Sequence, residues 1–190
     1  MEALKVEDVF RDLPELHTPR LLLRRVRLED AADMFEYASD PEVTKEVTWD
    51  THKAIKEAEG FLRFTVEKYG RGEVSDWGIV LKENNKFIGM CGFIWWLPQH
   101  AKAEIGYVLS RKYWGRGLMA EAVGAVMDFG FDKMKLHRLQ ARCNEPNTGS
   151  ERVMQKCGMK YEGLARDVVF EKGMFKNVKT YARLSSDRVK

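Results

Sequence analysis

The chain is organised around one stretch, Lys112-Tyr113-Trp114-Gly115-Arg116-Gly117-Leu118-Met119-Ala120. A strand-like run at residues 103–109 leads into it, and a helical pattern begins at Leu118. Two glycines between a strand and a helix let the backbone turn tightly, and the first amides and positive dipole end of the helix attract an anion. The stretch therefore predicts a site for phosphate or another anion. A connection that needs glycine only to turn would show the same local pattern.

Composition and charge indicate one soluble globular domain. The chain has 190 residues, of which 44% are hydrophobic and 32% are charged, as in a domain of ordinary size. The net charge of +3 is too small to predict a nucleic-acid partner. No apolar run approaches the roughly 20 residues of a membrane span. Acidic residues in the first 17 positions argue against a signal peptide, so we expect a cytoplasmic location.

Three cysteines, Cys91, Cys143 and Cys157, form an odd count without a C-x-x-C pair. This count favours buried reduced thiols, with a catalytic cysteine as the alternative. No metal site is expected.

Periodicity and turn signals predict seven strands and four helices in a mixed α/β (α+β) fold. The predicted strands cover residues 21–27, 77–81, 87–96, 102–109, 137–143, 161–170 and 179–184. The predicted helices cover residues 29–38, 51–69, 118–134 and 150–156, with Thr51 capping the second and Asn147 or Thr148 the fourth. The strands between 77 and 109 form an antiparallel meander. Residues 1–17 are a lead-in to a single domain at 18–185, and residues 43–49 have no clear pattern.

Four passages carry a resemblance to a known family. They are Thr18-Pro19-Arg20-Leu21-Leu22-Leu23-Arg24, Ala103-Glu104-Ile105-Gly106-Tyr107-Val108-Leu109, Tyr113-Trp114-Gly115-Arg116-Gly117-Leu118-Met119-Ala120-Glu121-Ala122, and Asn147-Thr148-Gly149-Ser150 followed by Lys156-Cys157-Gly158-Met159. In this order they resemble the GNAT superfamily of acyl-CoA-dependent N-acyltransferases, and within it the RimJ/RimL-type branch. The resemblance implies a twisted, mostly antiparallel sheet of six to seven strands flanked by about four helices.

The resemblance also implies acetyl-CoA as the co-substrate. The family's loop pattern, Q/R-x-x-G-x-G/A, falls on Lys112, Gly115 and Gly117, and Lys112 departs from its first letter. Backbone amides of the loop would hold the pyrophosphate, and the preceding strand would line the pantetheine arm. Arg116 could reach a phosphate or remain a solvated loop residue. The implied cofactor-binding residues are Tyr107, Val108, Leu109, Gly115, Arg116, Gly117, Leu118, Met119, Ala120 and Asn147.

Two residues are candidates for the proton transfers of acyl transfer. Many GNAT enzymes protonate the departing thiolate with a tyrosine, but the corresponding position here is Met154. The RimL-like pattern places a serine three residues after the asparagine, which identifies Ser150 as the proposed acid. Ser150 could equally satisfy a backbone amide in the first helical turn. Glu104 is the candidate general base, with an ion pair to Lys102 as its alternative role, and Tyr107 is expected to pack beside the cofactor.

The resemblance leaves the acceptor open. A protein N-terminal α-amine is the first expectation, and it rests on family analogy. A small amine such as a polyamine, amino sugar or antibiotic is the alternative, as is a module that binds acyl-CoA without turnover. Trp95 and Trp96 could wall an acceptor site. A membrane partner is not expected, and a homodimer is left open.

Overall fold

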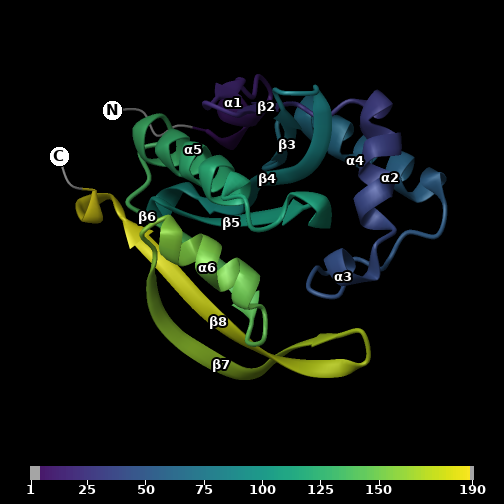
Figure 1. Ribbon diagram of the computed structural model, residues 1–190. Helices are drawn as coiled ribbons and strands as arrows, with labels where there is room; N and C mark the ends of the chain where they lie inside the picture. The colour runs from purple at the N-terminus through teal and green to yellow at the C-terminus, as the bar shows by residue number, and fades with distance from the viewer. Residues whose placement is uncertain (1–4, 189–190) are drawn as a thin grey trace.

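One eight-stranded sheet, in the order β1-β2-β3-β4-β5-β6-β8-β7, forms the centre of the computed structural model, which describes residues 5–188 (Figure 1). The pairs are antiparallel except for β5 with β6, which run parallel. The strands are β1 (Leu16–His17), β2 (Leu21–Arg24), β3 (Asp76–Leu81), β4 (Lys86–Leu97), β5 (Lys102–Leu109), β6 (Arg138–Asn144), β7 (Lys160–Glu171) and β8 (Met174–Leu184).

Six α-helices accompany the sheet among these residues. They are α1 (Val6–Phe10), α2 (Ala31–Ala38), α3 (Pro41–Thr44), α4 (Ile55–Arg71), α5 (Leu118–Asp132) and α6 (Thr148–Lys156). The predicted mixed α/β fold and the meander of β3, β4 and β5 are confirmed. The sheet has one strand more than predicted, because the two-residue β1 is too short to show a periodic pattern. None of these helices is both long enough and apolar enough to cross a membrane.

The predicted start of the second long helix is wrong. Helix α4 begins at Ile55 with Ala54 at its N-cap, so Thr51 does not cap it. Thr51 Oγ1 instead shares a hydrogen bond of 2.5 Å with Thr44 Oγ1, at the end of α3. Residues 43–49, which show no pattern in the sequence, contain the end of this short helix and the turn after it.

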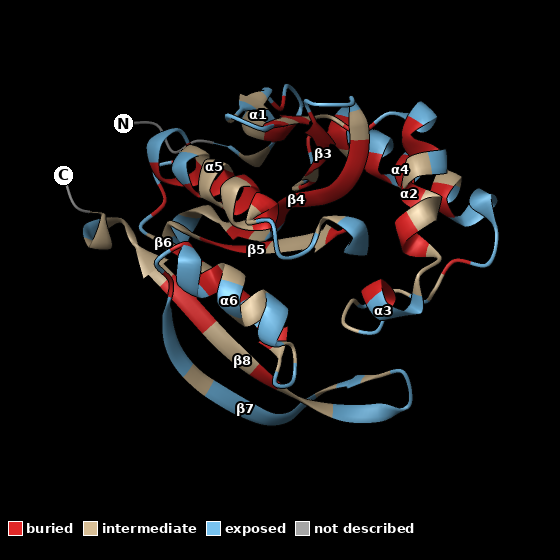
Figure 2. Ribbon diagram, in the orientation of Figure 1, coloured by how far each residue is buried: buried red, intermediate tan, exposed pale blue. Residues whose placement is uncertain are grey.

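Helices pack on both faces of the sheet, and a bulge in β4 changes which of its side chains point to each face. The register between β3 and β4 shifts at Ile88, so Phe87 and Phe93 point to opposite faces despite their even spacing. Phe87 stacks on Tyr37 of α2, whereas Phe93 lies against Gly130 of α5. In Figure 2 the central strands β3 and β4 are almost entirely buried, while the edge strand β7 is mostly exposed.

The described part of the lead-in packs on the domain. Phe10 of α1 is fully buried and meets Phe93 edge to face, with ring centroids 6.1 Å apart. Trp77 Nε1 donates a hydrogen bond of 2.7 Å to the carbonyl of Pro14. Residues 1–4 of the lead-in lie outside the described residues.

The parallel pair β5 and β6 stays together for only three residue pairs. Pairing begins at Lys102 with Arg138 and ends at Glu104 with Gln140. Beyond this point the β6-facing edge of β5 has no strand partner, although its other edge stays paired with β4 up to Leu109. The two strands therefore diverge, and the opening between them is the natural place for a ligand.

Candidate active site

A cavity of about 630 Å³ lies where β5 and β6 diverge. Its wall combines the end of β5, the glycine loop with the first turn of α5, the turn before α6 with one face of that helix, and α3 with the residues after it. The lining residues are Glu42, Val43, Lys45, Glu46, Val47, Tyr107, Val108, Leu109, Tyr113, Trp114, Gly115, Gly117, Leu118, Met119, Ala120, Pro146, Asn147, Thr148, Gly149, Ser150, Arg152, Val153 and Lys156. Four separate parts of the chain thus meet at one surface.

The glycine loop presents unpaired backbone amides to this cavity. Gly115 and Gly117 have φ of 76° and 74°, in the left-handed region that favours glycine. The first hydrogen bond of α5 runs from Glu121 N to Gly117 O at 3.1 Å, so the amides of Leu118, Met119 and Ala120 have no intrahelical acceptor. No side chain caps this helix. The donor set suits the pyrophosphate of acetyl-CoA.

The Thr18-Pro19-Arg20 passage fixes the start of α5. Glu121 Oε1 accepts hydrogen bonds from Thr18 Oγ1 at 2.6 Å and from Arg20 N at 2.9 Å. The Arg20 guanidinium pairs with Glu121 Oε2 at 2.7 Å and donates to the carbonyl of Arg116 at 3.0 Å. Burial acts to raise the pKa of Glu121, but these hydrogen bonds outweigh it and hold that pKa below its usual value. The negative charge of the first turn is thereby neutralised.

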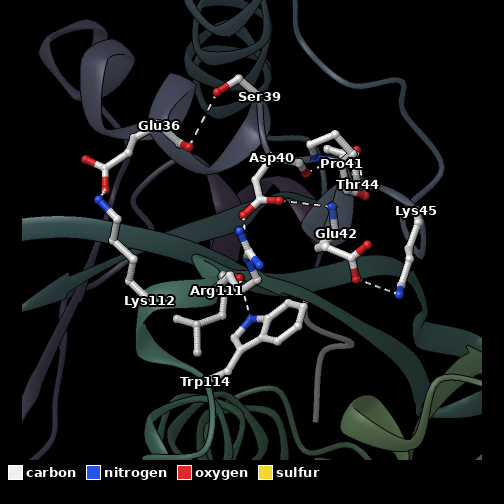
Figure 3. Close-up of polar contacts among 11 residues, drawn as sticks. Glu36, Ser39, Asp40, Pro41, Glu42, Thr44, Lys45, Arg111, Lys112 and Trp114 are labelled. Atoms are coloured by element: carbon white, nitrogen blue, oxygen red, sulfur yellow. Dashed lines mark hydrogen bonds and ion pairs between the residues drawn. The ribbon is translucent and has the colours of Figure 1, made fainter.

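A second set of contacts ties the loop to α2, α3 and β5 (Figure 3). Lys112 Nζ pairs with Glu36 at 2.5 Å, and Arg111 Nε pairs with Asp40 at 2.6 Å. Trp114 Nε1 donates to the carbonyl of Leu109 at 2.8 Å. Lys112 therefore has a structural partner of its own, which explains why the sequence can depart from the family's first loop letter at this position.

Ser150 contacts a tyrosine, Tyr107, and no pattern in the sequence predicts this pairing. Tyr107 on β5 and Ser150 on α6 share a hydrogen bond of 2.7 Å between their hydroxyl oxygens. The Tyr107 hydroxyl also lies 3.1 Å from the Ser150 carbonyl. Burial raises the pKa of Tyr107 far above its usual value, and the hydrogen bond to Ser150 only partly opposes this. The phenol therefore keeps its proton at neutral pH.

Asn147 caps α6 with its side-chain oxygen, which leaves its side-chain amino group as a hydrogen-bond donor. Its Oδ1 accepts a hydrogen bond of 2.9 Å from the amide of Ser150, as the capping prediction required. The backbone amide of Ser150 is thus satisfied by Asn147, and the Ser150 hydroxyl is left for Tyr107. Among residues 5–188, no acceptor lies within hydrogen-bond distance of the Asn147 side-chain amino group, and Asn147 lines the cavity.

Glu104 is buried in a bridge between the two parallel strands. Its carboxylate accepts hydrogen bonds of 2.9 Å from Gln140 Nε2 and 2.9 Å from Arg142 Nε, both on β6. Its side chain is 7% exposed, and Glu104 does not line the cavity. The partner expected from the sequence, Lys102, instead lies over the ring of Trp95. Glu104 therefore sits at the junction from which β5 and β6 diverge.

Three other expected residues lie away from the cavity wall. The Arg116 guanidinium stacks over the ring of Tyr113, 5.4 Å from its centroid, and does not line the cavity. Trp95 and Trp96 are also absent from its lining, so their expected place in the wall of an acceptor site stays a prediction. Trp114 lines the cavity instead, as part of the glycine loop.

Charge is unevenly distributed along the cavity wall. Arg152 and Lys156, four residues apart on α6, are exposed along one side of that helix. The two carboxylates, Glu42 and Glu46, come from α3 and the turn after it. Residues 43–49 show no clear pattern in the sequence, so Glu46 could not be recognised as a site residue.

The three cysteines are free and buried, as predicted. Burial raises the pKa of Cys143 and of Cys157 to about 11. A thiol with so high a pKa is a poor nucleophile at neutral pH. Cys157 Sγ lies 3.4 Å from the carbonyl of Ala120 and so contacts the first turn of α5 from α6.

Comparison with known proteins identifies the family. The model of the acetyltransferase (GNAT) domain matches residues 20–160. The chain is 34% identical over 172 residues to the uncharacterized N-acetyltransferase p20 of Bacillus licheniformis, covering 90% of this chain and 97% of p20. The crystal structure of a GNAT-family acetyltransferase from Bacillus anthracis superposes with a TM-score of 0.82 at 29% identity, covering 91% of this chain and 99% of that one. The chain belongs to the GNAT family and is an N-acetyltransferase.

The name of a more distant relative states which acceptor that relative uses. The ribosomal-protein-serine acetyltransferase of Escherichia coli (strain K12) is 28% identical over 106 residues, which cover 56% of this chain and 59% of that protein. This likeness agrees with the resemblance to the RimJ/RimL-type branch that the four sequence passages carry.

Proposed function

We propose that this N-acetyltransferase uses acetyl-CoA to acetylate a primary amine, with a protein N-terminal α-amine as its acceptor. The observation that carries the proposal is the cavity where the start of α5, the open edge of β5 and Ser150 share one wall. The acceptor is supported by the serine acetyltransferase relative of Escherichia coli. Bound acetyl-CoA would supply an acyl group activated as a thioester.

The residues that would hold acetyl-CoA follow from the donors on the cavity wall. The amides of residues 115–120 would bind the pyrophosphate at the positive end of α5. The unpaired edge of Tyr107 and Val108, together with the Asn147 amino group, would bind the amides of the pantetheine arm. Leu109 would contribute contact area, because its carbonyl is already bonded to Trp114. Arg116 would approach a phosphate only by leaving the Tyr113 ring.

The Ser150 and Tyr107 hydroxyls would supply the proton for the departing thiolate. The Tyr107 hydroxyl can donate to Ser150 Oγ, which frees the Ser150 proton to point into the cavity. Burial keeps Tyr107 protonated, so the pair retains both protons at neutral pH. Ser150 would thus act directly, and Tyr107 would act through it.

Glu104 would position the site, in addition to its proposed part in proton removal. Its bonds to Gln140 and Arg142 hold β5 and β6 together one residue before they separate. A carboxylate held in this way fixes the width of the cavity. A base role for Glu104 would require a water molecule between it and the amine.

Thiol release from acetyl-CoA tests this function. The amines are a tripeptide with a free serine N-terminus, a tripeptide with a free alanine N-terminus, 2-phenylethylamine, spermidine and kanamycin. We expect release above the rate without amine, fastest with the two peptides. If thiol is released only with the small amines, the acceptor is a small amine and not a peptide N-terminus. Binding of acetyl-CoA without release in any reaction would overturn the proposal in favour of a non-catalytic module.

A further inference from the structure

Of the two carboxylates that line the cavity, Glu46 has no cation within ion-pair distance in the described part of the chain. Glu42 and Glu46 both line the cavity, but Glu42 pairs with Lys45 at 2.8 Å. No Lys, Arg or His among residues 5–188 lies within ion-pair distance of Glu46. Its only hydrogen bond there is accepted by Oε2 from Asn144 Nδ2, at 3.0 Å. Oε1 has no hydrogen-bond or ion-pair partner among these residues, and Glu46 lines the cavity.

Asn144 connects this carboxylate to the proposed acid. Asn144 is the last residue of β6, and its carbonyl accepts a hydrogen bond of 2.9 Å from the amide of Asn147. Asn147 in turn caps the helix at Ser150. A short chain of hydrogen bonds thus fixes Glu46 relative to the turn that carries Ser150, and both residues line the same cavity.

The wall that carries Glu46 is itself held from two sides. Asp40, at the start of α3, pairs with Arg111 beside the glycine loop. Lys172, in the turn between β7 and β8, donates to the carbonyl of Thr44 at the end of α3. A single unpaired carboxylate in a fixed position suits recognition of one positive charge.

We propose that Glu46 binds the ammonium group of the acceptor and takes one of its protons, which makes cationic primary amines the acceptor class. The proposal rests on the function proposed above. It moves proton removal from Glu104 to Glu46, which lines the cavity, and leaves Glu104 as the residue that joins the strands.

The proton and electron balance is simple. One ammonium proton passes to Glu46 Oε1 and then to solvent, which frees the nitrogen lone pair. That lone pair forms the new C–N bond as the C–S bond breaks, and sulfur keeps the electron pair of the broken bond. The sulfur takes a proton from Ser150 Oγ, which is restored from Tyr107. The second proton lost by nitrogen returns through solvent to the hydroxyl pair, so one proton is released per turnover.

Several charged or titratable groups lie near Glu46. The ionisable groups on the elements that meet near it are Glu42 and Lys45 of α3, Cys143 of β6, Arg152 and Lys156 of α6, Tyr107 of β5, Lys172 of the β7–β8 turn, and Glu171 and Lys176 of the two hairpin strands. Most of them are neutral, cationic or already paired. Glu42 is paired with Lys45, and Glu171 lies 3.6 Å from Lys176.

The test compares Glu46→Gln with Asp50→Asn, a matched control. Asp50 is an exposed carboxylate four residues further along the same segment and does not line the cavity. The probe is whichever of the five named amines the wild type acetylates fastest. At pH 7, Glu46→Gln should lower kcat/KM for this amine by about 100-fold, as for loss of a general base, while Asp50→Asn leaves it unchanged. The loss should shrink at a pH above the pKa of the amine, about 8 for a peptide N-terminus.

Binding without turnover gives a second readout. With the protein saturated by free CoA, calorimetry should show affinity for the same amine weakened about tenfold in Glu46→Gln, as for loss of a charge-assisted hydrogen bond. Affinity for acetyl-CoA itself should stay unchanged. Equal behaviour of Glu46→Gln and Asp50→Asn, or a rate loss in Glu104→Gln alone, would overturn the inference while leaving the acetyltransferase function intact. A wild type that releases no thiol with any amine would overturn both.

Discussion

Arg111 Nε lies 2.6 Å from Asp40 Oδ2, and this ion pair joins the segment before the glycine loop to the start of α3 (Figure 3). Asp40 Oδ1 also accepts a hydrogen bond of 3.0 Å from the amide of Glu42 and so caps α3. One carboxylate thus connects the segment before the glycine loop to the wall that carries Glu46.

Two substitutions of Asp40 separate its cap from its ion pair. Asp40→Asn keeps an oxygen for the cap and loses the charge, so the free energy of unfolding should fall by less than about 1 kcal/mol, as for exposed pairs. Asp40→Ala loses both contacts and should cost about 1 kcal/mol more. Denaturant titration measures both values. Equal losses in the two variants would show that the cap contributes nothing.

The glycine loop gives a prediction that separates backbone strain from cofactor binding. A Cβ at Gly115 meets no atom within 4 Å, and the same is true at Gly173 in the β7–β8 turn, where φ is 79°. Alanine at either position should cost about 1–2 kcal/mol of stability, because both residues have left-handed backbones. Only Gly115→Ala should also weaken acetyl-CoA binding, measured by calorimetry. Equal affinity in the two variants would argue against pyrophosphate binding at this loop.

A charged residue in the same loop should have a larger effect. Gly115→Glu adds a negative charge and bulk beside the amides of α5, where the pyrophosphate would bind. We expect it to abolish acetyl-CoA binding, while Gly173→Glu keeps wild-type affinity. Retained affinity in Gly115→Glu would mean that its glycine serves only to turn the chain.

The sequence predicts the helix caps and turns that are determined by residues close together in the chain. The cap at Asn147, the end of α6 at Cys157 and the turn that leads into α5 all follow from side chains within a few positions. Helix α3 and strand β1 were missed because four and two residues are too few to show a period. Their stability comes from the contacts they make, such as the pair between Asp40 and Arg111.

The site itself was only partly predictable, for the same reason. The glycine loop is continuous in sequence, so its glycines could be recognised directly. Tyr107 and Ser150 are 43 residues apart, and their contact exists only because the fold brings the start of α6 to the end of β5. Glu46 and Asn144 are 98 residues apart. Neither pair has a local pattern from which it could be inferred.

The hydroxyl pair predicts non-additive kinetics. Ser150→Ala and Tyr107→Phe should each lower kcat by about 10- to 100-fold, because each interrupts the same proton path. The kcat of the double variant should lie within a few-fold of the kcat of the slower single variant. Calorimetry should find acetyl-CoA affinity little changed in Ser150→Ala, and Tyr161→Phe, at an exposed tyrosine of β7, should keep wild-type kcat. An unchanged rate in Ser150→Ala would exclude its role as the acid.

Glu121 predicts an acid-sensitive anchor for α5. Its folded-state pKa is below the unfolded value of 4.5, because the hydrogen bonds from Thr18 and Arg20 outweigh the opposing effect of burial. Its stabilising contribution is therefore fully present above that value and is lost as the pH falls through the folded-state pKa. Glu121→Gln should cost about 1–3 kcal/mol at pH 7, as for hydrogen bonds to a charged group.

That cost should shrink as the pH is lowered below 4.5. The Glu121 carboxylate is then protonated first in the unfolded chain and, at lower pH, in the folded protein. Denaturant titrations at pH 7, 5 and 3.5 measure the difference between the two proteins. Glu83→Gln, which removes an exposed carboxylate from the β3–β4 turn, provides the control and should show no such trend. A difference between wild type and Glu121→Gln that stays constant over this range would mean that the charge of Glu121 does not hold α5 to the Thr18-Pro19-Arg20 passage.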